Sequence, residues 1–156
     1  MSFFAWLEAS GLGEWVRAST LGYPLMIASH AIGMAIMVGL AVVFDMRLLG
    51  WFKRIPYREF DRFLSIAWAG FTINLVSGTA LFSTQAATYI TDITFLLKMA
   101  LVVAGVVLAV FLRGAVSHRS ASWHGAAAPG GIRLVAVGSI ACWVGATVSG
   151  RLIAYL

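Results

Sequence analysis

The sequence predicts an all-α protein, an integral membrane four-helix bundle with short interfacial helices before its first span. Hydrophobic residues make up 61% of the 156 residues and charged residues only 11%, whereas about a quarter of a soluble domain is charged. Four long apolar stretches occur, each close to the ~20 residues that a helix needs to cross the hydrocarbon core. The connections are short, so we expect a single transmembrane domain over residues 1–156.

An aromatic-rich segment over residues 2–22 precedes the first apolar stretch. It lacks the basic start that a signal peptide needs. We therefore expect one or two short interfacial helices, broken at Gly11 and Gly13 and anchored by Trp6 and Trp15.

The predicted spans cover about 24–44, 63–84, 93–113 and 132–154. Pro24 begins the first of them, since proline is tolerated in a first helical turn. The connection over 114–131 is rich in Ser, Ala and Gly, which predicts a flexible loop.

Basic residues are concentrated on one side of the predicted bundle. The connections after the first and third spans carry Arg47, Lys53, Arg54, Arg58, Arg62, Arg113, Arg119 and Arg133. The opposite side has little beyond Arg17, so the positive-inside rule places both termini outside. We expect a multi-pass protein of the bacterial inner (plasma) membrane with both termini in the periplasm. This asymmetry explains the net charge of +5, and no motif for binding nucleic acid accompanies it.

Lys98 lies in the apolar run 94–112. A charge at such depth costs at least about 2.5–3.5 kcal/mol on insertion scales, so it usually marks a site or a partner. With a rise of ~1.5 Å per residue, His30 lies roughly 9 Å below Pro24, and Lys98 lies at a similar depth in the third span. Arg151 is about one turn inside the outer end of the fourth span, so the three groups can meet in the outer half of the bundle.

The residues that share helix faces predict what surrounds this cluster. Met26, Met34 and Met37 lie on the His30 face of the first span, and Asn74 and Ser77 share a face of the second span with two glycines. Two stripes of small residues suit close helix packing: Ala31, Ala35 and Gly39 on the first span, and Ala141, Gly145 and Ser149 on the fourth.

One imidazole and two cations in a cavity suit a b-type haem. Neutral imidazole binds iron, and Lys and Arg neutralise carboxylates. We expect His30 as the axial ligand, Lys98 as second ligand or propionate partner, and Arg151 as propionate or anion clamp. Asn74, Ser77 and Tyr155 are expected to add hydrogen bonds around these groups. The pattern predicts electron transfer or redox chemistry with a membrane partner, as an oxidoreductase or an electron-transfer subunit, and assigns no catalytic residue.

Other interpretations stay open. Lys98 and Arg151 can extend to the outer headgroups, and His30 can simply hydrogen-bond to Asn74 or a serine. Met26, His30, Met34 and Met37 form a soft ladder suited to a copper ion, which predicts copper binding or transport. A third alternative is a non-catalytic subunit of a membrane complex, or a homo-oligomer, supported by the two small-residue stripes.

Three segments carry a resemblance to known families: residues 29–50, FLLKMALVVAG at 95–105 and the terminal GRLIAYL at 150–156. They resemble a family of uncharacterised bacterial four-span membrane proteins that end in GRLIAY. More distantly, the chain is similar to the HemJ-type protoporphyrinogen oxidases and to CopD-like membrane proteins. In the HemJ type a corresponding His and Lys serve a haem b site, so the resemblance implies a haem role for His30 and Lys98.

Overall fold

The computed structural model describes residues 3–123, 126–153 and 155. The helical elements in chain order are α1 (Phe3–Glu8), α2 (Gly11–Ala18), α3 (Gly22–Leu48), η1 (Tyr57–Glu59), α4 (Phe60–Phe82), α5 (Ala86–Tyr89), α6 (Ile93–Arg119), η2 (Ser120–Trp123) and α7 (Gly130–Leu152). The described part of the chain contains no strand. Four helices, α3, α4, α6 and α7, are long and apolar enough to cross a membrane. The predicted class, an all-α membrane bundle, is confirmed.

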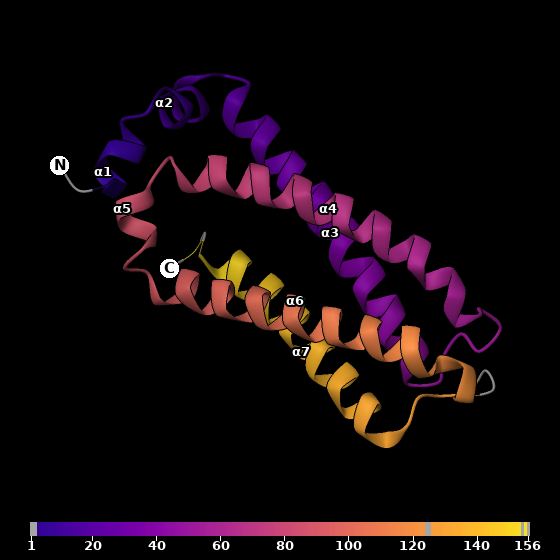
Figure 1. The fold of residues 1–156 in the computed structure, drawn as a ribbon. Coiled ribbons are helices and arrows are strands. Elements are labelled where there is room, and N and C mark those ends of the chain that lie inside the picture. Colours follow the sequence, from indigo (N-terminus) through magenta and orange to yellow (C-terminus); the bar gives the residue numbers. More distant parts are fainter. Residues whose placement is uncertain (1–2, 124–125, 154, 156) are drawn as a thin grey trace.

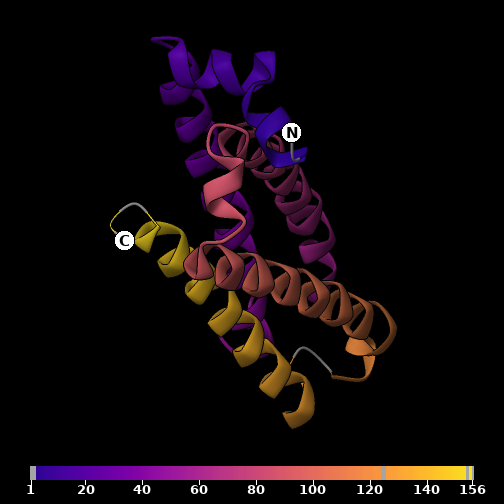
Figure 2. The same cartoon turned by 90° about the vertical axis from the view of Figure 1, so that its left-hand side faces the viewer.

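The spans are arranged as two helix pairs (Figures 1 and 2). α3 packs along α4, α6 packs along α7, and the contact between α3 and α7 joins the two pairs. α4 and α6 do not pack along each other in the described residues. Both termini lie at one end of the bundle together with α1, α2 and α5, which we call the terminal end (Figure 1). The opposite end, with η1 and η2, is the loop end.

Glycines let α3 and α4 approach closely. A Cβ atom at Gly33 would lie 2.8 Å from both the backbone nitrogen of Asn74 and the carbonyl oxygen of Gly70. A Cβ atom at Gly70 would in turn lie 3.0 Å from the carbonyl oxygen of Gly33. Backbone therefore meets backbone at this crossing, as in membrane helix pairs that use small residues.

A buried arginine connects the elements of the loop end. Arg47 is 0% exposed, and its guanidinium donates hydrogen bonds to the carbonyl oxygen of Ile55 at 2.9 Å and of Ala126 at 3.3 Å. It also donates to the Tyr57 hydroxyl at 3.1 Å, and that hydroxyl donates to the Ala126 carbonyl at 2.7 Å. Tyr57 packs edge-on against Trp123, with the ring centroids 5.3 Å apart. These contacts fix both loop-end connections to the end of α3.

The N-terminal helices cover the connection between α4 and α6. The Ser10 hydroxyl caps α2 by accepting a hydrogen bond from the Gly13 N–H at 3.3 Å. Glu8 accepts a hydrogen bond from the Ala87 N–H at 2.8 Å, and Arg17 donates to the carbonyl oxygen of Thr84 at 3.3 Å. The predicted interfacial segment is therefore a cap on the terminal end.

Three predicted boundaries were wrong. The break between α1 and α2 is at Ala9 and Ser10, and Gly11 and Gly13 lie inside α2, because the Ser10 cap begins that helix. α6 continues to Arg119 and η2 follows it, so most of the predicted loop over 114–131 is helical, held by the buried side chains of Val116 and Trp123. The second span ends at Phe82 rather than residue 84. Ser2 and Ala154, the predicted limits of the cap segment and of the fourth span, lie outside the described residues.

The stripe expected to pack the first span does not do so within this chain. Ala31, Ala35 and Gly39 are exposed, and a Cβ atom at Gly39 would meet nothing within 4 Å. Close packing uses Gly33 instead, which lies on another face of α3. On the fourth span, Gly145 faces Leu101 of α6, Ser149 is buried and Ala141 is exposed. The stripe on the fourth span thus packs partly within the chain, whereas the stripe on the first span does not.

Candidate functional site

A cavity of about 460 Å³ lies at the terminal end, between the two helix pairs. We call it the terminal cavity. It is lined by Tyr23, Ile27, His30, Ala31, Met34, Gly78, Leu81, Phe82, Tyr89, Phe95, Lys98, Thr147, Gly150, Arg151 and Ile153. His30, Lys98 and Arg151 thus face one space, although they come from three different spans.

The position of the His30 ring is set by α4. Its Nδ1 atom lies 3.1 Å from the carbonyl oxygen of Asn74 and 3.3 Å from the Ser77 hydroxyl. A carbonyl oxygen can only accept, so Nδ1 carries the proton when this hydrogen bond forms. The Asn74 side chain donates to the backbone carbonyl of His30 at 3.0 Å. A Cβ atom at Gly78 would lie 3.0 Å from Cε1 of the ring, so the missing side chain makes room for the imidazole.

This hydrogen bond determines what His30 can do chemically. A neutral imidazole protonated at Nδ1 has its lone pair on Nε2. The same arrangement, in which one ring nitrogen donates to a carbonyl and the other faces a ligand, orients histidines that bind metals. His30 is half-buried and lines the terminal cavity. The alternative prediction, that His30 only hydrogen-bonds to Asn74 or a serine, therefore describes Nδ1 but assigns no partner to Nε2.

Two cations share the cavity without a carboxylate to neutralise them. In the part of the chain that the structure describes, neither Lys98 nor Arg151 has an ion-pair partner. Lys98 is half-buried, and a Cβ atom at Gly150 would lie 3.4 Å from its Nζ atom. Arg151 is exposed and donates to the Tyr155 hydroxyl at 3.1 Å.

Stacked aromatic rings form one wall of the cavity. Phe82, Tyr89 and Phe95 stack with one another at centroid distances of 5.4 to 6.2 Å. Asp92 begins α6 by accepting hydrogen bonds from the Thr94 and Phe95 N–H groups, which fixes the Phe95 side of the stack. Burial raises the pKa of the Tyr89 phenol, and the nearby Tyr23 and Asp92 add to this, so the phenol stays neutral. The wall is thus aromatic and uncharged.

The structure separates the other predicted site residues. Asn74 and Ser77 contact His30 as expected. Tyr155 is 71% exposed, contacts Arg151 and does not line the cavity. Met34 lines the terminal cavity, whereas Met37 lines a different pocket and Met26 lines neither. The predicted methionine ladder is therefore divided, because a helical stripe only 80° wide still spans more than one cavity along its length.

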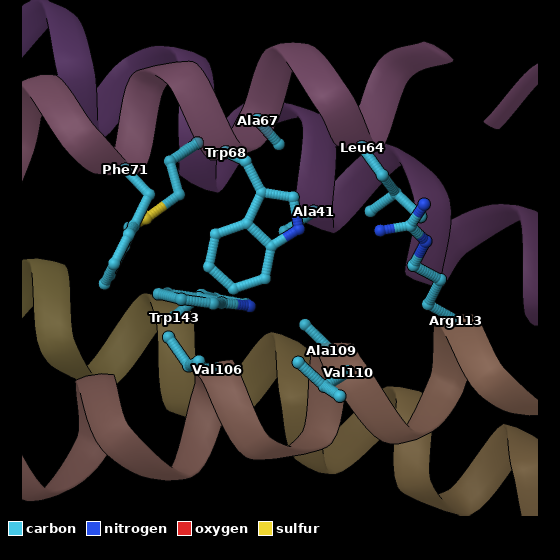
Figure 3. Close-up of a pocket in the computed structure, with 11 residues that line it drawn as sticks. Ala41, Leu64, Ala67, Trp68, Phe71, Val106, Ala109, Val110, Arg113 and Trp143 are labelled. Carbon is cyan, nitrogen blue, oxygen red and sulfur yellow. The ribbon is translucent and has the colours of Figure 1, made fainter. Parts of the chain in front are cut away.

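A second, smaller pocket lies nearer the middle of the spans (Figure 3). This middle pocket has a volume of about 100 Å³ and is lined by Met37, Ala41, Leu64, Ala67, Trp68, Phe71, Val106, Ala109, Val110, Arg113 and Trp143. Three buried polar atoms have no hydrogen-bond partner among the described residues, and one of them, Trp143 Nε1, belongs to this pocket. The sequence did not reveal this pocket, since its lining residues look like ordinary apolar core.

No group of three or more His, Cys, Asp or Glu side chains that could hold a metal ion occurs among the described residues. A metal at the terminal cavity would therefore depend on the His30 imidazole and on ligands of another kind.

Comparison with known proteins gives one family. A model described as a family of unknown function (DUF6644) matches residues 3–156. Neither the curated proteins nor the solved structures include a significant match. The likeness to HemJ-type and CopD-like proteins stays a prediction. Because the family model covers nearly the whole chain, this four-span membrane protein belongs to the DUF6644 family.

Proposed function

We propose that this protein binds a b-type haem in the terminal cavity, with His30 Nε2 as an axial ligand, and serves electron transfer or redox chemistry in the membrane. The main support is the hydrogen bond that His30 Nδ1 donates to the Asn74 carbonyl at 3.1 Å. Because Nδ1 is used in this bond, Nε2 is the nitrogen of the cavity-lining ring that can bind a ligand. The Ser77 hydroxyl donates to the Ile73 carbonyl at 2.6 Å, so its oxygen can also accept from Nδ1.

The charges of the cavity suit the acidic side of a haem. Its two propionates are carboxylates, and Lys98 and Arg151 are cations without an ion-pair partner in the described residues. We assign Arg151, at the exposed mouth, to a propionate, and Lys98 to a propionate or to the second axial position. The stacked rings of Phe82, Tyr89 and Phe95 offer a flat apolar wall to a macrocycle.

The chain's own groups hold and orient such a cofactor. Asn74 and Ser77 fix the imidazole plane, and Gly78 and Gly150 leave the space that side chains would fill. When bound, haem iron supplies one-electron transfer, and its potential depends on axial ligands, hydrogen bonds and burial. The half-buried cavity lies close to one end of the bundle, where a redox partner can approach.

The test is an optical spectrum of the purified protein after expression with haem supplementation. We expect a Soret band in the wild-type protein and its loss in His30→Ala. Met34→Leu is the matched control, because Met34 lies one turn along the same helix and lines the same cavity. A wild-type protein without a Soret band, even after supplementation, would refute the haem proposal.

The copper alternative keeps two soft ligands in the terminal cavity, His30 and Met34. Met37 and Met26 lie elsewhere, and Lys98 and Arg151 would repel a cation. A Cu(I) titration separates the two proposals. Stoichiometric binding that Met34→Leu abolishes and Lys98→Ala leaves unchanged would favour copper over haem.

The orientation that we propose places the terminal end in the periplasm of a bacterium and the loop end in the cytoplasm. Eight of the eleven Lys and Arg residues belong to the connections and helix ends of the loop end, and only Arg17, Lys98 and Arg151 lie toward the terminal end. The haem would then lie in the periplasmic half of the membrane.

A further inference from the structure

The middle pocket has the shape and lining of a site for a flat ring. Trp68, Phe71 and Trp143 supply aromatic surfaces, and Ala41, Ala67 and Ala109 leave space between them (Figure 3). Its volume of about 100 Å³ is smaller than the ~150 Å³ of a cavity that encloses a benzene ring, so a flat ring would enter from the open side and fill the pocket only with part of its surface. No lining residue is shared with the terminal cavity.

Two polar side chains, Arg113 and Trp143, line this otherwise apolar pocket, and the Trp143 indole N–H lacks a partner in the described residues. Trp143 is 2% exposed, and its Nε1 atom has no hydrogen-bond acceptor in the described part of the chain. A buried N–H without an acceptor costs roughly 1–3 kcal/mol. Figure 3 shows the Trp143 ring nearly edge-on, with its indole nitrogen at the end of the ring nearer Ala109. The Trp143 ring cannot easily turn away, because it packs against Gly105, where a Cβ atom would lie 3.0 Å from the indole.

The pocket lies in the gap between α4 and α6, with Arg113 among its lining residues. These two helices do not pack along each other in the described residues. Trp68 from α4 and Val110 from α6 are 38% and 54% exposed, and both belong to helices that are apolar enough to cross the membrane. Trp143 itself lies near the middle of α7. A ligand of this pocket therefore enters from the lipid phase.

We propose that the middle pocket binds the ring of a lipid-soluble quinone, with Trp143 Nε1 donating a hydrogen bond to one ring carbonyl oxygen. The ring lies against the aromatic side chains, and the isoprenoid tail leaves between α4 and α6 into the bilayer. A lipid acyl chain fills the same space but leaves the indole N–H unpaired. The site is separate from the terminal cavity, so the proposal does not depend on haem binding.

The experiment measures binding of a short-chain quinone, ubiquinone with a single isoprene unit, to the full chain in nanodiscs by equilibrium dialysis. Binding to protein-free nanodiscs is subtracted. An alkylbenzene of similar size, which has no carbonyl, is measured in parallel. We expect saturable one-to-one binding of the quinone and an affinity about tenfold above that of the alkylbenzene.

Three variants locate the site. Trp143→Phe keeps an aromatic ring but removes the donor, so it should lose the tenfold preference for the quinone while still binding the alkylbenzene. Ala109→Leu fills the pocket and should abolish binding of both probes. Trp15→Phe is the matched control, because Trp15 is 46% exposed at the terminal end and should bind like the wild type. Circular dichroism checks that each variant is folded.

Three results would overturn the proposal. If Trp143→Phe keeps the full preference for the quinone, Trp143 does not recognise the carbonyl, and equal binding of the two probes to the wild type would point to a site for lipid tails. If Ala109→Leu binds the quinone like the wild type, the middle pocket is not the site. None of these results bears on the Soret band of the wild-type protein, so failure of the quinone site and failure of the haem proposal are distinguishable.

Discussion

His30 shows how a single hydrogen bond changes the meaning of a residue. In the sequence it is one imidazole in an apolar span, equally compatible with a ligand and with a hydrogen-bonded core residue. The Asn74 carbonyl at 3.1 Å from Nδ1 fixes which nitrogen carries the proton and which has the free lone pair. Because Nδ1 donates its proton to the carbonyl, Nε2 is left with the lone pair that can bind a ligand.

Gly78→Ala tests whether haem binding depends on the present position of the His30 ring. The added Cβ atom would lie 3.0 Å from Cε1, so the ring or the helix must shift. If His30 binds haem, we expect haem affinity to fall by about tenfold, measured by haem titration of the purified apoprotein. Gly114→Ala in α6 is the matched control, because its Cβ atom would meet nothing within 4 Å. Equal affinity in both variants would show that the ring position does not matter.

Lys98→Met separates the three roles predicted for Lys98. Loss of an axial ligand would move the absorption bands of the haem, whereas loss of a propionate partner would weaken haem binding and leave band positions unchanged. A lysine that only extends to the headgroups would give neither effect. We expect weaker binding with unchanged bands, since Arg151 alone would remain for the two propionates. Spectra of the oxidised and reduced variant provide the measurement.

The positions of the charged residues could be predicted from the sequence, but not those of their neighbours. Depth along a helix follows from residue count, so His30, Lys98 and Arg151 could be placed together. Which residues touch them depends on how the helices cross. That is why Gly78, Gly150 and Tyr89 were missed, why Tyr155 contacts Arg151 without lining the cavity, and why the methionines, predicted to form one ladder, are divided between cavities.

At the scale of the elements, the close contact of α3 and α4 positions the site. Gly33 and Gly70 bring the two backbones together, and Asn74 and Ser77 on the next turns of α4 then reach His30. The sequence contains several small residues on α3, and spacing alone favoured Ala31, Ala35 and Gly39. Which of two small-residue stripes on a helix packs against the neighbouring helix depends on the angle at which the helices cross. The pattern of apolar residues does not predict that angle.

Gly33→Ala is expected to destabilise the protein. Its Cβ atom would lie 2.8 Å from backbone atoms of Asn74 and Gly70, which cannot rotate away, so α3 and α4 must separate. We expect the free energy of unfolding to fall by about 1–3 kcal/mol, as in other overpacked contacts. Gly39→Ala on the same helix should show no loss, because nothing lies within 4 Å of that position. Denaturant titration in mixed micelles, followed by circular dichroism, compares the two; equal stability would contradict the contact.

At the scale of the whole molecule, composition and four apolar runs were sufficient to predict an all-α membrane bundle. They could not predict that the bundle is two helix pairs joined through α3 and α7, with α4 and α6 apart. Every face of an apolar helix is compatible with lipid, so hydrophobicity does not predict which helix faces pack against each other. The pairing is instead determined by glycine contacts, by Trp143 against Gly105 and by the loop-end hydrogen bonds of Arg47.

The topology predicts the outcome of reporter fusions at the C-terminus. The positive-inside rule places the loop end, with its basic residues, in the cytoplasm. A C-terminal alkaline phosphatase fusion should therefore be active in a bacterial host, and a C-terminal green fluorescent protein fusion should be dark. Fusions that break the chain after Arg54 should give the reverse pattern. A fluorescent C-terminal fusion would invert the proposed orientation.

The buried Arg47 also constrains how the chain is assembled during synthesis. Its acceptor at Ala126 is 79 residues further along the chain, so two more spans must be made before that carbonyl exists. Until then the guanidinium has the Ile55 carbonyl and the Tyr57 hydroxyl of the first connection as partners but lacks the Ala126 carbonyl. The full set of loop-end contacts therefore forms only after the third span and the second connection have been made, and a nascent chain that stops before Ala126 would lack this acceptor for Arg47.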